Sequence, residues 1–357
     1  MPGGLVRWFD DVRLGDRPDV GGKCASLGEL VAAGIPVPRG FAVTVAAFEA
    51  VRSGVGDALD RLVAGCDPGS PPALRDVRHR AGELLAGAAL PGTLEAEVRA
   101  GYAELCRRAG RDDVPVAVRS SAVAEDGAAA SFAGQQETYL WVRGADDVLR
   151  RLRDCWASVY TPQAVAYRAG LDGTRRREGA RIAVGVQEMV DARVAGVAFT
   201  VSPLTGDPSV VAVNASWGLG EAVVSGEVTP DEYWVSKIGP VLTRSTVAHK
   251  TWRRVPAPSG SGTVLVDVPP DLVDAPCLDR ALVTELAGIA VRVERHYGRP
   301  QDIEWALADD GDGGHRFLLL QSRPETVHAV RPAARSEVPG YLSVVRSIAA
   351  RTCPEAS

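Results

Sequence analysis

The residues best suited to binding or catalysis lie in the segment QDIEWALADDGDGGHRFLLLQSRPET, residues 301–326. Two short apolar runs flank a turn rich in glycine and aspartate, which is typical of a β-hairpin. Glu304 interrupts the first run, and Gln321 and Arg323 end the second. Because side chains alternate between the two faces of a strand, a turn at residues 311–314 predicts that Glu304 lies opposite Gln321, with Arg323 nearby.

Such a hairpin face carries two oxygen ligands and one fixed cation. Oxygen ligands suit Mg²⁺, and a planar guanidinium suits phosphate. Strict alternation also groups Leu318 with Leu320 and places Leu319 on the face of Gln321. The alternative is an ordinary hairpin whose polar face meets water, as half-solvated antiparallel hairpins do.

A glycine-rich turn near the start of the chain is a second candidate site. In VGGKCASLGEL, Gly21 and Gly22 precede Lys23, and a helix is expected to follow. A glycine turn that leads into a helix N-terminus can bind an anion, and Lys23 adds a point charge. The spacing differs from that of a P-loop. The alternative is a surface turn and helix cap with an exposed lysine.

A third candidate is the end of the strand predicted at residues 114–118. In VPVAVRSSAVAEDG this strand runs directly into Arg119, Ser120 and Ser121. A cation followed by two hydroxyls can hold phosphate through side chains and backbone N–H groups. The alternative is a strand-end arginine that pairs with Glu125 or Asp126.

Three further motifs have less specific chemistry. AAASFAGQQETYL, residues 128–140, is rich in small residues and predicts a flap that approaches a ligand closely, or else a disordered surface loop. VQEMV, residues 186–190, would suit a connector that hydrogen-bonds a planar group through its backbone, but it carries little information alone. The glycines around Glu221 predict close backbone approach, or else a simple bend between a strand and a helix.

The expected elements place these motifs at strand ends and turns. The sequence divides into a helix-rich first half and a strand-rich second half, with the change near residues 180–195. Helices are expected at 25–34, over much of 45–110 with a break at 66–72, at 145–170, and at 278–298, with Gly34 and Gly298 as stop signals. Strands are expected at 114–118, 181–190, 195–201, 209–217 and 231–237, before the hairpin and a tail from residue 327.

Composition sets limits on the class of protein. The 357 residues are 46% hydrophobic and 24% charged, which predicts two or more globular lobes. A net charge of −5 gives no general attraction to nucleic acid or anionic membranes. No signal segment or membrane span is expected. The cysteines show no C-x-x-C pair, so we expect reduced thiols in a cytoplasmic protein; they are at positions 24, 66, 106, 155, 277 and 353.

Taken together, the motifs resemble a known family. GGKCASLGEL, VAVRSSAVAED, SFAGQQETYL, VQEMV, NASWGLGEAVVSG, DIEWA and LLQSRPE occur in the order seen in phosphoenolpyruvate synthase. The same set is similar to the ATP-binding parts of pyruvate phosphate dikinase and rifampicin phosphotransferase. The resemblance covers roughly residues 5–327, nearly the whole chain.

The resemblance implies an α+β fold of the ATP-grasp type, in which two lobes clamp ATP. The expected lobes are residues 1–190, with the phosphate-binding loop and flap, and 191–330, with the metal-binding hairpin; 331–357 would form a tail. It also implies ligands for ATP and Mg²⁺. Phosphates would be held by Lys23, Arg119, Ser120, Gly134, Thr138, Arg323 and Lys250, the adenine by the hinge Gln187, Glu188, Met189 and Val190, and Mg²⁺ by Glu304 and Gln321. Lys23, Arg119 and Arg323 would carry the catalytic charge.

Two departures from the family pattern bear on function. Ala195 replaces a small hydroxyl residue, which removes no expected ligand. Full-length members continue into a domain with a phosphorylated histidine and then an acceptor domain; they pass the β-phosphoryl group of ATP to that histidine and release AMP and phosphate. None of the five histidines here has the expected Gly-Gly-Thr-x-His setting; they are at 79, 249, 296, 315 and 328.

The resemblance therefore predicts an ATP-dependent phosphotransferase component that acts on a histidine of a separate partner protein or domain. Direct transfer to a small molecule in the cleft is a second hypothesis. A nucleotide-binding module without turnover is a third, which the intact set of expected ligands disfavours.

Overall fold

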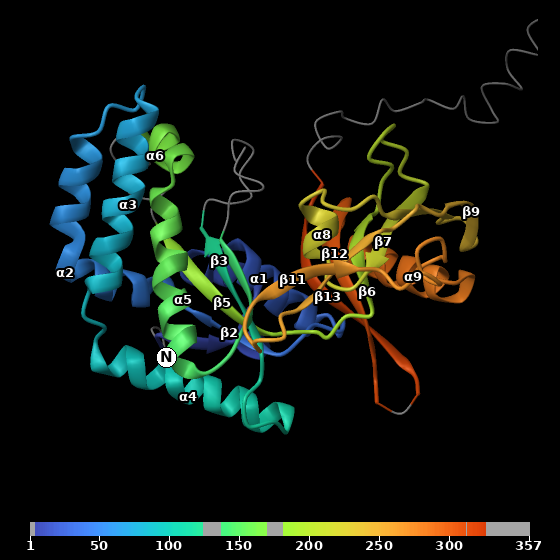
Figure 1. The fold of residues 1–357 in the computed structure, drawn as a ribbon, viewed down its shortest axis with the longest axis horizontal. Coiled ribbons are helices and arrows are strands. Elements are labelled where there is room, and N and C mark those ends of the chain that lie inside the picture. The colour runs from blue at the N-terminus through green and yellow to red at the C-terminus, as the bar shows by residue number, and fades with distance from the viewer. Residues whose placement is uncertain (1–3, 124–136, 170–180, 312, 326–357) are drawn as a thin grey trace, which may run out of the picture. The chain divides into compact units, whose positions relative to one another are not determined.

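The computed structural model describes residues 4–123, 137–169, 181–311 and 313–325. Helices and strands alternate in it, which confirms the predicted α+β class, and by their contacts residues 1–325 form one unit. The strands form two separate antiparallel sheets and one ribbon (Figure 1). No helix in the described ranges is long and apolar enough to cross a membrane.

The first sheet has the strand order β1-β2-β5-β3-β4. Its core lies between the sheet and a layer of helices, with Phe41, Phe48 and Trp156 fully buried. The strands are β1 Val6–Trp8, β2 Gly40–Val43, β3 Val116–Ala122, β4 Thr138–Val142 and β5 Ile182–Glu188. The helices are α2 Val45–Ala64, α3 Pro71–Gly87, α4 Gly92–Ala109, α5 Ala145–Ala157 and α6 Pro162–Ala169, with short 3-10 turns at Phe9–Asp11, Leu14–Asp16 and Ser158–Tyr160.

The second sheet has the order β13-β12-β6-β7-β8-β9. Helix α9, Arg280–Tyr297, packs on it through an apolar face that includes Leu286, Ala290 and Val293. The strands are β6 Val194–Phe199, β7 Val210–Trp217, β8 Asp231–Ser236, β9 Val241–Thr246, β12 Gln301–Asp309 and β13 His315–Pro324; the short helix α8 spans Glu221–Val224. A separate ribbon pairs β10, Trp252–Pro256, with β11, Thr263–Asp267.

Helix α9 shows why local signals predicted its ends correctly. The Asp279 side chain accepts a hydrogen bond from the backbone N–H of Leu282 at 2.9 Å, which caps the first turn. Gly298 ends the helix at φ 66°, in the left-handed region that glycine adopts without steric cost. The predicted helix at 278–298 is confirmed.

Three predicted boundaries were wrong. The helix predicted at 145–170 is interrupted by a 3-10 turn before Pro162, since proline favours a helix start over a helix interior. The helix predicted at 25–34 is α1, Arg17–Ala32, bent at Gly21. Strand β3 continues through Arg119 to Ala122, so Arg119 lies inside the strand rather than after it.

Helix α1 contributes to the core of the second sheet and to a small apolar cluster beside the first sheet. Leu27 packs in a small cluster beside the first sheet, whereas Leu30 belongs to the core of the second sheet. The loop after α1 continues this contact, because the backbone N–H of Leu319 donates to Pro36 O at 2.9 Å. The division into lobes at residue 190 stays a prediction, and these contacts cross it.

The Gly21 turn is in close contact with the C-terminal end of β3. Gly21 has φ 73°, and a Cβ atom there would lie 2.0 Å from Ser121 O. The Ser121 hydroxyl donates to Val20 O at 2.9 Å and accepts from the Cys24 N–H at 3.1 Å. The sequence suggested Ser121 as one of two hydroxyls for phosphate; in the structure its hydroxyl is bonded to the turn and fixes it.

We predict that Gly21→Ala destabilises the protein by about 3 kcal/mol or more, because it adds a steric clash to the cost of the left-handed conformation. Gly34→Ala is the matched control: Gly34 has φ 66° but open space around its Cβ position. The control should lose about 1 kcal/mol. Denaturant unfolding measures both, and equal losses would contradict the packing argument.

Candidate functional site

The β12–β13 hairpin brings the predicted metal ligands together. Glu304 and Gln321 are Cα partners across the hairpin, and Asp302 faces Arg323 in the next pair on that face. This confirms the predicted opposition of Glu304 and Gln321.

A β-bulge corrects one detail of that prediction. The register shifts after Glu304, so that Trp305 pairs with Leu319 and Leu320 is the extra residue. Leu319 packs with Trp305 in the second core, on the face away from Gln321. Strict alternation had placed Leu319 with Gln321, and this was wrong because alternation fails at a bulge.

Arg119 joins the first sheet to this hairpin. Its Nη2 donates to Gln321 Oε1 at 2.7 Å and to Glu304 Oε2 at 3.1 Å, and its Nη1 donates to Leu320 O at 2.9 Å. Its side chain is 13% exposed and that of Glu304 is 24% exposed. The alternative partners, Glu125 and Asp126, lie outside the described residues. One guanidinium therefore contacts both of the predicted metal ligands.

Asp302 is a residue of this face that sequence analysis missed. Its Oδ2 accepts from Arg323 Nη2 at 2.7 Å and from Nε at 2.8 Å. Its position two residues before Glu304 on the same strand was the signal that could have identified it.

Burial raises the pKa of Asp302, and the Arg323 guanidinium offsets only part of this shift. Glu304 and Glu325 raise the pKa further. Folding therefore favours the protonated form of this carboxyl. Its contribution to stability is greatest at low pH and is lost as the pH rises through the raised pKa.

Lys23 lies beside the end of β3, directly after the Gly21 turn. Its Nζ donates to Ser120 O at 3.2 Å, and Ser120 is buried. Thr138 on β4 is the Cα partner of Arg119. The structure thus places the backbone of Ser120 beside Lys23, and Thr138 beside Arg119 in the sheet. Gly134 lies outside the described residues.

Part of the backbone of the predicted adenine hinge is already hydrogen-bonded within the first sheet and its adjoining loops. Gln187 lies within β5, with Gly40 and Ala117 as its Cα partners. The N–H groups of Glu188 and Met189 donate to Arg39 O at 2.8 Å and Pro115 O at 2.9 Å. A nucleotide bound here would therefore use the carbonyl groups of this segment or the backbone of Val190.

The Gln187 side chain points toward Arg119 instead. Its Oε1 lies 3.5 Å from Arg119 Nη1. Its Nε2 is buried without a hydrogen-bond partner in the described structure, as is Nε of Arg119. Unpaired buried donors are costly, so these two atoms suit a polar ligand at this position.

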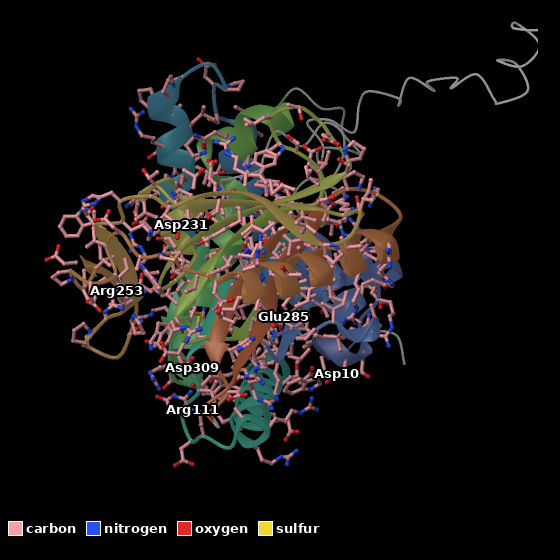
Figure 2. All side chains as sticks on the ribbon, turned by 90° about the vertical axis from the view of Figure 1, so that its right-hand side faces the viewer. Asp10, Arg111, Asp231, Arg253, Glu285 and Asp309 are labelled. Atoms are coloured by element: carbon pink, nitrogen blue, oxygen red, sulfur yellow. The ribbon has the colours of Figure 1, made fainter. Side chains whose placement is uncertain are left out.

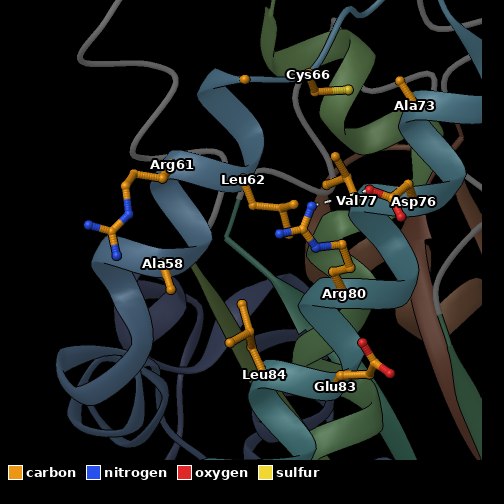
Figure 3. Close-up of a pocket in the computed structure, with 11 residues that line it drawn as sticks. Ala58, Arg61, Leu62, Cys66, Ala73, Asp76, Val77, Arg80, Glu83 and Leu84 are labelled. Atoms are coloured by element: carbon orange, nitrogen blue, oxygen red, sulfur yellow. Dashed lines mark hydrogen bonds and ion pairs between the residues drawn. The ribbon is translucent and has the colours of Figure 1, made fainter.

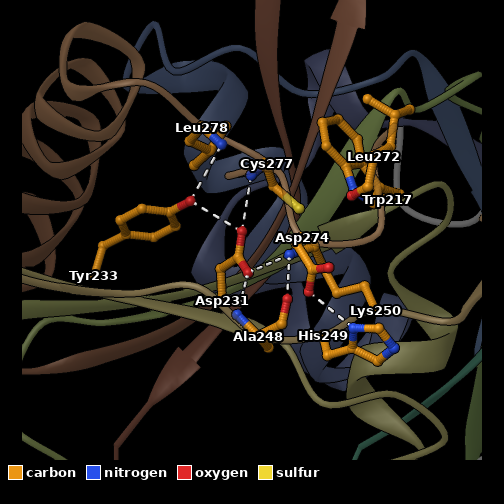
Figure 4. A network of polar contacts seen from close by, with 10 residues as sticks. All are labelled: Trp217, Asp231, Tyr233, Ala248, His249, Lys250, Leu272, Asp274, Cys277 and Leu278. Carbon is orange, nitrogen blue, oxygen red and sulfur yellow. Dashed lines mark hydrogen bonds and ion pairs between the residues drawn. The ribbon is translucent and has the colours of Figure 1, made fainter. Parts of the chain in front are cut away.

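Lys250 lies in a different, fully buried network (Figure 4). Its Nζ lies 2.5 Å from Asp231 Oδ1 and also donates to Ala248 O at 2.8 Å. Asp231 accepts further bonds from the Cys277 N–H at 2.8 Å and the Tyr233 hydroxyl at 3.1 Å. The structure gives this lysine a buried carboxylate partner, and its contact with phosphate stays a prediction.

A cavity of 590 Å³ lies between α2 and α3, apart from the residues described above (Figure 3). Its walls are formed by both helices and their connection, and they include Leu62, Cys66, Val77 and Arg80. None of the predicted site residues lines it. The candidate site is therefore identified by its polar contacts and not by an open cavity.

The sequence has clear similarity to known proteins. Residues 17–339 match the family described as "Pyruvate phosphate dikinase, AMP/ATP-binding domain". A probable phosphoenolpyruvate synthase of Pyrococcus horikoshii is 40% identical over an alignment of 363 residues, gaps included. The alignment covers 90% of this chain and 43% of that protein.

Two more relatives agree with this match. A probable phosphoenolpyruvate synthase of Methanothermobacter thermautotrophicus is 42% identical over 323 residues, covering 90% of this chain and 46% of the relative. The phosphoenolpyruvate synthase of Pyrococcus furiosus is 38% identical over 363 residues, covering 90% and 44%. The chain spans less than half of the length of these relatives.

For the buried pair, we predict that Lys250→Met destabilises the protein by about 3–5 kcal/mol, because it leaves the Asp231 carboxylate buried without its cation. The control is Arg80→Met, which breaks an exposed pair with Asp76 and should change stability by about 0.5 kcal/mol or less. Denaturant midpoints compare the two. A Lys250→Met protein as stable as the control would mean that this ammonium group is not essential to the network.

Proposed function

The chain belongs to the family of the pyruvate phosphate dikinase AMP/ATP-binding domain, and from this premise we propose that it is an ATP-dependent phosphotransferase component. It binds Mg-ATP between two ATP-grasp lobes, one built on each sheet. Arg119, Glu304 and Gln321 are the residues on which the proposal rests, since they meet where the two sheets come together.

The contact of Arg119 with Glu304 and Gln321 is the single observation that carries the proposal. Mg²⁺ is commonly held by one or two protein oxygens together with substrate phosphates. Glu304 and Gln321 supply such oxygens, and Arg119 supplies a cation for phosphate. In the structure these groups satisfy one another. On binding of Mg-ATP, Glu304 and Gln321 would hold the metal and Arg119 would hold phosphate in place of these mutual contacts.

The remaining residues complete the phosphate site. Lys23 adds a second cation next to the Gly21 turn, and Arg323 adds a third that Asp302 holds through two hydrogen bonds. Thr138, on the strand beside Arg119, provides a hydroxyl. Bound Mg²⁺ neutralises phosphate charge, and these cations stabilise the charge that develops during transfer.

Adenine binding falls to the Gln187–Val190 segment and the small apolar cluster beside it. Val190, Ala195, Ala306 and Leu318 are buried together at this point. Short alanine side chains leave a flat apolar surface suited to a purine ring. The buried Nε2 of Gln187 supplies a donor for the nucleotide.

The phosphoryl acceptor is proposed to be a histidine on a separate protein or domain. The described histidines are engaged elsewhere: His249 pairs with Asp274, and His296 with Glu29, each at 2.8 Å. His315 pairs with Glu285 at 3.0 Å, and His79 lies 3.5 Å from Glu83. A nucleophile must reach the phosphorus atom in line, and none of these four contacts Arg119, Glu304 or Gln321.

We predict that Glu304→Gln and Arg323→Ala each lower turnover of Mg-ATP by about two orders of magnitude or more, with the fold intact, because each removes charge stabilisation from the transition state. The matched controls are Glu285→Gln and Arg316→Ala, both on exposed positions. Circular dichroism checks the fold, and consumption of labelled ATP with acceptor present measures turnover. Near-normal consumption in either site variant would refute the assignment.

We also predict that the isolated chain forms no stable phosphoenzyme. It is incubated with ATP labelled at the β-phosphate, quenched in alkali and tested for acid-labile label. AMP formed only with a partner protein supports the proposal. Product formed with a metabolite alone would indicate direct transfer, and binding without any turnover would indicate a non-catalytic module. Stoichiometric label lost on one His→Ala change would show that the chain carries its own relay.

A further inference from the structure

The β10–β11 ribbon is a part of the structure that the proposed function does not use. Its strands pair with each other in five cross-strand pairs, from Trp252 with Asp267 to Pro256 with Thr263, and Arg254 also forms one isolated parallel bridge with Gly218. It belongs to neither sheet. Figure 2 labels Arg253 on this ribbon and Asp231 at the start of β8. An isolated two-stranded ribbon is marginally stable, so its position depends on what holds its two ends.

The base of the ribbon is fixed by the buried Lys250 network. Lys250 lies two residues before β10, and its backbone N–H donates to Val273 O at 2.9 Å. The N–H of Val268, directly after β11, donates to Thr251 O at 2.9 Å. The ion pair of Lys250 with Asp231 therefore fixes the segment at which the ribbon leaves the second sheet.

The middle of the ribbon is held by the glycine-rich turn after β7. The Leu219 N–H donates to Arg254 O at 2.9 Å, and Gly218, at φ 78°, comes so close that a Cβ atom would lie 2.4 Å from this oxygen. Arg254 also pairs with Glu227 at 2.6 Å and Glu221 at 3.3 Å. These contacts make the ribbon a stiff arm, and they explain why Gly218 of the NASWGLGEAVVSG motif is a glycine.

The tip of the arm reaches the other sheet. The turn is closed by the Ala257 N–H, which donates to Gly262 O at 3.0 Å, and the Gly262 N–H then donates to Trp141 O at 3.2 Å. Trp141 lies on β4, the edge strand of the first sheet. Figure 1 shows the ribbon, in orange, extending from the second sheet toward these strands.

Trp141 has an unusual backbone conformation at this contact. Among the described residues it is the non-glycine residue with a positive φ, at 57°. The left-handed region costs a residue with a large side chain about 1–2 kcal/mol. The register between β3 and β4 is also irregular here, since Val116 pairs with Val142 but Val118 pairs with Tyr139. Strain of this kind persists where the surroundings impose it.

We propose that the β10–β11 ribbon is a clasp on edge strand β4, and that Trp141 is the positioning residue through which the docked tip holds Thr138 in place for the nucleotide. The role of Thr138 rests on the proposed function. Thr138 and Trp141 lie three residues apart on one short strand. A contact that restricts the backbone at Trp141 therefore also restricts the backbone at Thr138. Nucleotide binding at Thr138 and tip docking at Trp141 consequently strengthen each other, as linkage requires.

The test shortens the tip and keeps the arm. Pro256 and Thr263 are Cα partners, so replacing residues 257–262 with Asn-Gly closes the hairpin with a two-residue turn and removes the docking N–H. The matched control replaces residues 310–314 with Asn-Gly between the paired Asp309 and His315, in a turn remote from Trp141 in sequence and topology. Both edits make the same kind of turn, and the arm's anchors at Lys250 and Arg254 remain.

Hydrogen exchange of residues 138–142 is measured first, in the ligand-free protein. The shortened tip should speed exchange of this segment about fivefold or more, and the control should leave it unchanged. Affinity for a Mg-bound, non-hydrolysable ATP analogue should fall about fivefold or more in the same variant. Unchanged exchange at residues 138–142 would overturn the clasp.

Thr138→Val in the full-length ribbon separates this inference from the proposed function. One outcome overturns the inference: Thr138→Val weakens binding of the analogue, but the shortened tip speeds exchange without changing affinity. In that case the clasp does not position Thr138. If Thr138→Val leaves affinity unchanged, the proposed contact of Thr138 with the nucleotide fails, whereas the exchange result alone still decides whether the tip docks on Trp141. Gly262→Ala, strained at φ 78°, provides a second variant of unaltered length and should shift both readouts in the same direction.

Discussion

The guanidinium of Arg119 is the interaction on which the candidate site depends. It extends from a strand of the first sheet and bonds Glu304, Gln321 and the Leu320 carbonyl on a hairpin of the second sheet. The largely buried carboxylate of Glu304 would be costly without a cation, so this contact holds the hairpin and the strand together. The same groups have the chemistry of a Mg-nucleotide site. One contact thus links the strand to the hairpin and, in the proposed function, supplies the ligands for Mg-ATP.

Helix α1 and the loop after it provide the second link between the sheets, through apolar packing and neutral hydrogen bonds. Its N-terminal turn lies against Ser121 on β3, while Leu30 reaches the core of the second sheet. The loop that follows bonds β13 through Pro36. Lys23 stands on the part of this helix nearest to β3. The cation is consequently fixed by the packing of both sheets and not by a flexible loop.

The buried pair of Lys250 and Asp231 stabilises a different part of the molecule. A buried ion pair is favourable only where further hydrogen bonds satisfy its remaining atoms, and Asp231 has them in the Cys277 N–H, the Ala248 N–H and the Tyr233 hydroxyl. The network stands where the β10–β11 ribbon begins and ends. This placement makes Lys250 an anchor for an arm that reaches the first sheet.

Local signals in the sequence were enough to predict the elements and features whose causes lie close together in the chain. The Asp279 cap and Gly298 stop define α9, and the glycine turn brings Glu304 and Gln321 near each other across the hairpin, since both depend on residues close in the chain. The exact pair depends on the bulge, because the register of Asp309 with His315 would by itself place Leu320 opposite Glu304. Motif order also indicated the family. The structure alone decided what depends on contacts between distant segments: the bulge at Leu320, the partners of Arg119, the burial of Lys250, and the docking of Gly262 on Trp141. Side-chain alternation and residue propensity cannot predict such contacts. The partner of a buried charge, the neighbours of an edge strand and a strained φ are fixed only when separate segments pack together.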